Sequence, residues 1–177
     1  MLSAKWNEVP WIAGTDARKS RDLLAIPSVQ GVWGIKNPES TFASVVADAQ
    51  AVEAEFVGRV GDNEENIQQV RRIITEMLLQ AAWDKDQPFE TCLQYWHDLQ
   101  ALGFYRLERR CLKTGLFAVI CQHYGHTDMG LALLEPLLAD LERLRAEPTA
   151  TKQEVDYYDY ELESLHKLRA RLEAQRG

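Results

Sequence analysis

Long apolar runs are missing from this 177-residue sequence. No stretch approaches the roughly 20 apolar residues that a helix needs to cross a bilayer. The opening residues, MLSAKWNEVPWIAG, also lack the apolar core of a secretory signal. Cysteine is scarce as well, and its odd count of three does not give a disulfide framework. We therefore expect free thiols, a cytoplasmic protein and no membrane partner.

Positive charge is also in short supply. The chain has 20 Lys and Arg residues against 27 Asp and Glu residues, for a formal net charge of −7. Nucleic-acid binding depends on Lys and Arg that replace the counterions of phosphates, so this balance argues against a nucleic-acid ligand. It is compatible with a protein partner that is basic or has a basic cleft.

The common motifs of catalysis are absent too. The sequence contains no glycine-rich phosphate loop, no GxSxG, no HExxH and no CxxC. Cys92, Cys111 and Cys121 each lie within an apolar run of helical spacing, which is the usual place of unreactive thiols. We therefore expect a protein that is not an enzyme and has no cofactor.

Helical periodicity is what the sequence does contain, from residue 37 to its end. Apolar residues recur at spacings of three and four, and Gly, Pro and Asp residues interrupt them at short intervals. Short turns make neighbouring helices antiparallel. We expect an all-α domain over 37–177, with helical hairpins stacked in a superhelix or a bundle. The helices are expected at about 37–60, 64–83, 89–102, 104–124, 127–146 and 152–175.

Residues 1–36 differ from this pattern. Trp6, Trp11 and Trp33 fall here among proline and glycine breaks. We expect an irregular segment that packs on the main domain and is held there by its tryptophans. The alternative is that the three rings form an aromatic contact surface.

One hairpin carries small residues where two helices would cross. Ala118 lies in the first helix, Gly125 in the turn and Gly130 in the second helix. Small side chains at a crossing let two helices approach closely. This arrangement resembles the tetratricopeptide (TPR) hairpin, and a related hairpin at about 64–102 extends the resemblance to about 64–145. The two hairpins are roughly 38–41 residues apart, against about 34 in the standard repeat. The resemblance implies stacked hairpins that bind another protein.

The run EVDYYDYELE, residues 154–163, is the first candidate for a partner-binding surface. Val155, Tyr158 and Leu162 take the predicted core face, so other side chains of the run fall outside it. Exposed tyrosine beside carboxylate is favourable interface chemistry, because a large rigid ring is combined with hydrogen-bonding groups. The alternative is an aromatic rim that covers the neighbouring hairpin. The predicted binding residues here are Tyr157, Tyr160, Asp156, Asp159 and Glu161.

Two further clusters allow more than one interpretation. Arg106 and Arg110, with Arg109 and Lys113, form a basic patch that could anchor an acidic partner or a phosphate. The alternative is a surface face that pairs with the acidic run or is simply solvated. In the stretch CQHYGHTD, His123 and His126 could converge with Asp128 on a metal ion. The alternative is a buried Cys121 next to histidines at a helix end, where histidine is favoured.

These features together predict a non-catalytic protein-binding module. We expect a small acidic immunity protein (antitoxin), or a chaperone or adaptor, that binds one specific basic partner. One alternative is a structural subunit that self-associates in a complex such as a secretion-system component. Another is a helical metal-binding protein that uses His123 and His126.

Overall fold

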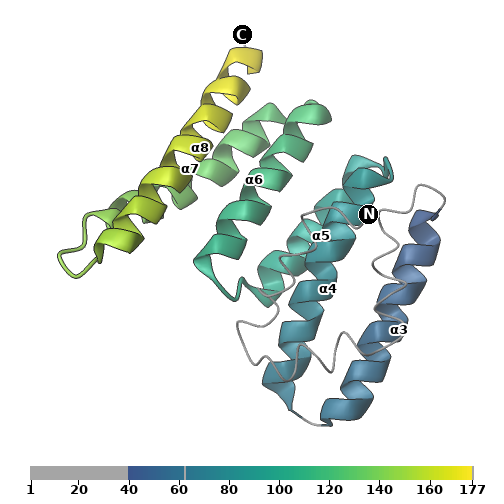
Figure 1. Ribbon diagram of the computed structural model, residues 1–177. Helices are drawn as coiled ribbons and strands as arrows, with labels where there is room; N and C mark the ends of the chain where they lie inside the picture. The colour runs from purple at the N-terminus through teal and green to yellow at the C-terminus, as the bar shows by residue number, and fades with distance from the viewer. Residues whose placement is uncertain (1–39, 62, 177) are drawn as a thin grey trace. The chain divides into compact units, whose positions relative to one another are not determined.

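The computed structural model describes residues 40–61 and 63–176, which form six helices and no strand (Figure 1). The all-α prediction is confirmed. The predictions for residues 1–36, including the three tryptophans, lie outside the described residues. None of the described helices is both long and apolar enough to cross a membrane. The helices are α3 (Phe42–Val60), α4 (Glu64–Asp84), α5 (Phe89–Leu102), α6 (Leu107–His123), α7 (Thr127–Arg145) and α8 (Lys152–Arg176).

Side-chain caps explain where several helices begin. Thr41 and Asn63 each accept a hydrogen bond from a backbone N–H in the first turn of α3 and α4, at 3.2 and 3.1 Å. Before α8, the backbone N–H of Thr151 donates to Glu154 Oε2 at 2.8 Å. The backbone N–H of Glu154 donates back to Thr151 Oγ1 at 3.3 Å, which completes a reciprocal capping box.

Two helices begin later than predicted. α3 begins at Phe42 rather than near 37, because Thr41 is extended and caps it. α6 begins at Leu107 rather than near 104, because Arg106 is still extended, with φ −139° and ψ 155°. Gly103, which has a φ of +76°, caps the C-terminus of α5, and residues 104–106 connect it to α6.

The chain divides into two compact units, residues 1–103 and 104–177. This boundary lies inside the stretch 37–177, and it separates the two predicted hairpins. In the first unit, α4 packs against both α3 and α5. The buried core between α3 and α4 is built from apolar residues at helical spacing: Val45, Ala49, Val52, Phe56, Val70, Ile73, Ile74, Leu78 and Ala81.

In the second unit, α7 packs against α6 and α8, and α6 also contacts α8. Each helix therefore has two neighbours, and each contributes to one shared core. The buried members of that core are Cys111, Ala118, Leu134, Leu137, Leu138, Leu141, Leu162, Leu165 and Leu172.

The helices of this unit approach one another closely at Gly130, as the small-residue pattern predicts. A Cβ atom at this position would lie 3.2 Å from the carbonyl oxygen of Ala118 and 3.4 Å from Cys121 Cβ. It would also lie 3.5 Å from Leu172 Cδ1, so residues from all three helices meet here. Gly125 closes the turn between α6 and α7 with a φ of +79°. The predicted crossing of α6 and α7 at Ala118 and Gly130 is confirmed.

Candidate partner-binding surface

Tyr160 stands out on the N-terminal half of α8. It has the largest exposed fraction, 68%, among the exposed large hydrophobic side chains of the described residues. Asp156 and Glu163 lie four residues before and three residues after it, so the three side chains share one face of the helix. Both carboxylates are exposed. We call Asp156, Tyr160 and Glu163 the Tyr160 surface.

The carboxylates of this region differ in their partners. Asp159 Oδ1 lies 2.5 Å from Arg145 Nε of α7, and Glu163 Oε1 lies 2.5 Å from Lys167 Nζ. The hydrogen bond from Lys167 lowers the pKa of Glu163. Asp156 makes no ion pair with any residue in 40–61 or 63–176. Exposed ion pairs are weak, so a cationic group brought in by a partner could compete for Glu163.

The predicted exposure of Tyr157 is wrong. Its hydroxyl oxygen is buried and has no hydrogen-bond partner among the described residues. Burial of the hydroxyl is the main cause that raises the pKa of Tyr157, followed by the neighbouring Cys111 of α6 and Glu161. The physical reason is that α8 packs against α6 as well as α7, so it buries a wider arc than a single stripe.

Cys111 and Glu161 complete this group, which we call the Tyr157 cluster. Cys111 is 2% exposed, and burial raises its pKa to about 11, so the thiol is protonated and unreactive near neutral pH. Glu161 lies one turn after Tyr157 and is half-buried. Burial raises the pKa of Glu161, while the nearby Tyr157 hydroxyl acts in the opposite direction. Glu161 therefore lies on the Tyr157 side of α8 rather than on the Tyr160 surface.

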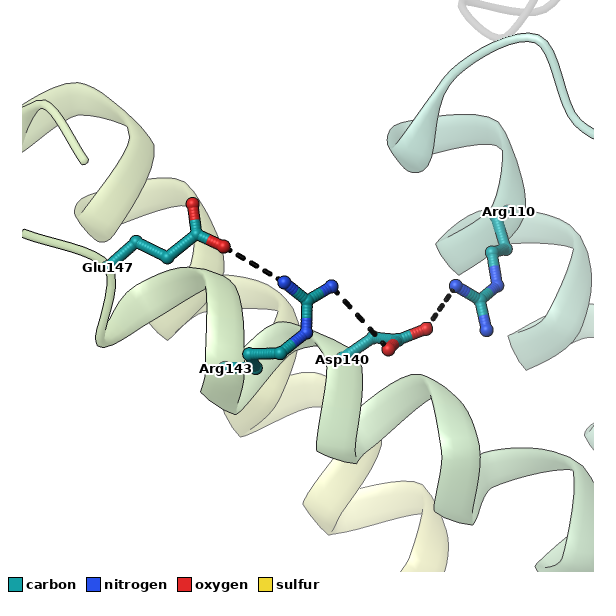
Figure 2. Close-up of polar contacts among 4 residues, drawn as sticks. All are labelled: Arg110, Asp140, Arg143 and Glu147. Carbon is teal, nitrogen blue, oxygen red and sulfur yellow. Dashed lines mark hydrogen bonds and ion pairs between the residues drawn. The ribbon is translucent and has the colours of Figure 1, made fainter. Parts of the chain in front are cut away.

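Arg110 of the predicted basic patch is engaged within the second unit. Arg110 Nη1 donates to Asp140 Oδ2 of α7 at 2.6 Å, and Arg143 extends this contact to Glu147 (Figure 2). Arg110 therefore pairs with α7 and not with the acidic run of α8, which was one of the alternatives for the patch. The reason is that α7 presents Asp140 directly opposite Arg110. Arg106 lies 5.5 Å from the ring centre of Tyr105.

Asp140 allows a test of this network. The hydrogen bond from Arg110 is the main cause that lowers the pKa of Asp140. A lowered folded-state pKa adds stability above the unfolded-state pKa, and that stability is lost as the pH falls through the folded-state value. We expect Asp140→Asn to lower the free energy of unfolding at pH 7 by up to about 1 kcal/mol. Urea unfolding between about pH 5 and pH 3 should show a shallower pH dependence than wild type. An unchanged pH dependence would show that the ion pair adds no stability.

The histidines do not form the three-ligand metal site given as an alternative. The rings of His123 and Tyr124 meet edge to face, with centroids 4.9 Å apart. Asp128 Oδ1 accepts from Arg176 Nε at 2.9 Å. Across residues 40–61 and 63–176, no three His, Cys, Asp or Glu side chains are placed so that they could hold a metal ion. His123 is the last residue of α6, His126 is the N-cap residue of α7, and Asp128 lies in the first turn of α7.

Comparison of the chain with protein-family models, with curated proteins and with solved structures finds no match. No known protein therefore adds information about the Tyr160 surface or the Tyr157 cluster. The pattern of apolar residues did not predict that Glu161 is half-buried. A second stripe of Tyr157, Glu161 and Leu168, beside the core stripe, is the signal that could have indicated two neighbours for α8.

Proposed function

We propose that the protein is a non-catalytic binding module that binds one basic protein partner through the Tyr160 surface. The observation that carries this proposal is the exposure of Tyr160, 68%, between two exposed carboxylates. A tyrosine ring offers large contact area at little cost in side-chain entropy, and its hydroxyl can form hydrogen bonds. Interfaces commonly depend on a few such anchors.

The charge of the chain supports a basic partner. A net charge of −7 favours encounter with a positively charged surface and disfavours acidic ones. At the surface itself, Asp156 has no ion pair with a described residue, and Glu163 has only an exposed one. An Arg or Lys of the partner could reach both a carboxylate and the face of the Tyr160 ring.

The proposed role is that of an immunity protein (antitoxin), or of a chaperone or adaptor. A TPR-like stack of helical hairpins is the proposed scaffold. The close approach of Ala118 and Gly130 supports that scaffold, since small residues at a crossing let two antiparallel helices pack closely. Residues on rigid helices hold a binding surface in place more accurately than residues on loops.

Substitution on α8 tests the proposed surface. We expect Tyr160→Ala to weaken the affinity for the partner captured from native lysate by about tenfold or more, the loss typical of an interface anchor. Asp156→Asn should cause a smaller loss and reduce the dependence of binding on salt. Tyr105→Ala is the matched control, because Tyr105 is another exposed tyrosine, at 44%, and lies outside α8.

Titration calorimetry with the purified partner measures these affinities. If Tyr160→Ala and Tyr105→Ala bind as wild type does, the partner uses another surface. If the purified protein instead forms a large defined oligomer without a partner, the self-assembling alternative takes the place of this proposal.

A further inference from the structure

One face of α7 is both apolar and exposed, although α7 already packs against α6 and α8. Met129 is 39% exposed, and Ala132, Pro136 and Ala139 are exposed as well. These four residues follow one another at spacings of three, four and three, so they lie in one line along the helix. The spacing is that of the a and d positions through which one helix packs against another. We call these four residues the α7 seam.

A row of carboxylates borders the α7 seam on one side. Asp128, Glu135 and Glu142 recur at intervals of seven residues, each directly before a position in the seam line, and all three are exposed. Asp128 pairs with Arg176 of α8, and Glu142 Oε1 lies 3.9 Å from His166 Nε2 of the same helix. The row therefore lies on the side of the seam that is next to α8. Glu135 makes no ion pair with any described residue.

Pro136 adds a hydrogen-bond acceptor to the same face. It lies inside α7 and has no N–H, so the carbonyl oxygen of Ala132 lacks the donor that the residue four positions later normally supplies. A donor side chain that lies along the seam can provide this hydrogen bond. The carbonyl oxygen and the carboxylate row thus both favour a partner that brings cationic N–H donors.

A second copy of this chain is a poor occupant of the seam. If two α7 helices packed antiparallel along their seams, the two carboxylate rows would face each other. If they packed parallel, Glu135 would face Asp140 of the other copy. Like charges opposite one another disfavour an interface. The charges beside the seam therefore select an occupant of the opposite sign.

We propose that the α7 seam binds a basic amphipathic helix of another protein, with the Lys and Arg residues of that helix along the carboxylate row. Ala132 and Ala139 are small, so the incoming helix can approach closely and fill the seam with its own larger apolar side chains. Glu135 is the carboxylate that a cation reaches without displacing an ion pair of the chain. The seam lies on α7, so its binding does not depend on Tyr160.

The test uses the full chain and two synthetic helical peptides, with titration calorimetry as the measurement. Both peptides carry leucine at their a and d positions, and they differ only at e and g, where one has lysine and the other glutamate. We expect the lysine peptide to bind and the glutamate peptide to bind at least tenfold more weakly, a difference that decreases as salt is added.

The double change Ala132→Gln and Ala139→Gln tests whether the lysine peptide occupies the seam. Glutamine keeps the helical preference and the net charge, but it places amide groups where the peptide would bury them. We expect the affinity to fall by about tenfold or more. Ala47→Gln with Ala51→Gln, at two exposed alanines of α3, is the matched control and should bind as wild type does.

Glu135→Arg tests the carboxylate row. It should weaken binding of the lysine peptide several-fold and strengthen binding of the glutamate peptide. Glu90→Arg, at an exposed residue of α5, makes the same change in net charge and should do neither. The proposal is overturned if the lysine peptide does not bind, or if the seam and row variants bind as their controls do. It is also overturned if Tyr160→Ala abolishes binding, which would place the peptide on the Tyr160 surface.

Discussion

Replacement of Leu172 by alanine is expected to destabilise the second unit by about 2–5 kcal/mol. Leu172 is 0% exposed and belongs to the core shared by α6, α7 and α8. Its Cδ1 atom also borders the crossing of α6 and α7, since a Cβ atom at Gly130 would lie 3.5 Å from it. Close-packed helices of this kind relax little, so removal of the side chain leaves a cavity that adds to the lost transfer free energy.

The probe for this experiment must report on the second unit. No tryptophan occurs in residues 104–177, so α6, α7 and α8 carry no tryptophan probe of their own. Hydrogen exchange resolved by helix distinguishes the two units, and we expect lost protection in α6, α7 and α8. Leu112→Ala is the control, because Leu112 is 53% exposed and its truncation should change stability by less than about 0.5 kcal/mol. If Leu172→Ala and Leu112→Ala lowered stability equally, the assignment of Leu172 to the buried core would be contradicted.

Gly130→Val is expected to destabilise the second unit by about 1–3 kcal/mol. The reason is steric: even the first added carbon would lie 3.2 Å from the carbonyl oxygen of Ala118, and this backbone atom is held within α6. Valine adds two further methyl groups beyond that carbon. The helices must therefore move apart, and the loss of packing between α6, α7 and α8 should appear as a lower melting temperature.

Gly115→Ala is expected to have the opposite effect on the stability of the second unit. A Cβ atom at Gly115 would meet Leu165 Cδ2 at 3.8 Å, which is an ordinary contact. Alanine also favours the helical conformation, so we expect Gly115→Ala to stabilise the unit by up to about 1 kcal/mol. If Gly130→Val were neutral or stabilising as well, the close approach at Ala118 would not exist in solution.

Local sequence signals were sufficient to predict the helices and the crossing of α6 and α7. Apolar spacing predicted the helices, and the small side chains Ala118 and Gly130 predicted where α6 and α7 cross. These signals work because each depends on residues close together in the chain. Helix starts were less accurate, since a cap such as Thr41 is decided by backbone conformation as well as residue type.

The candidate site depends on contacts between residues that are far apart in the sequence. The sequence was less informative about these contacts. Tyr157 and Tyr160 have the same chemistry, yet one hydroxyl is buried against α6 and the other side chain is exposed. Which of them faces solvent depends on the second neighbour of α8. The partner of Arg110 likewise depends on the rotation of α7 that presents Asp140.

Site-specific crosslinking from Tyr160 tests the central claim most directly. Tyr160→p-benzoylphenylalanine places a photoreactive ring at the proposed anchor, and the same change at Tyr105 is the control. The account predicts a single basic partner, covalently captured on illumination of native lysate from position 160 and not from position 105. Capture from position 105 alone, or a product at position 160 that contains only a second copy of this chain, would contradict it.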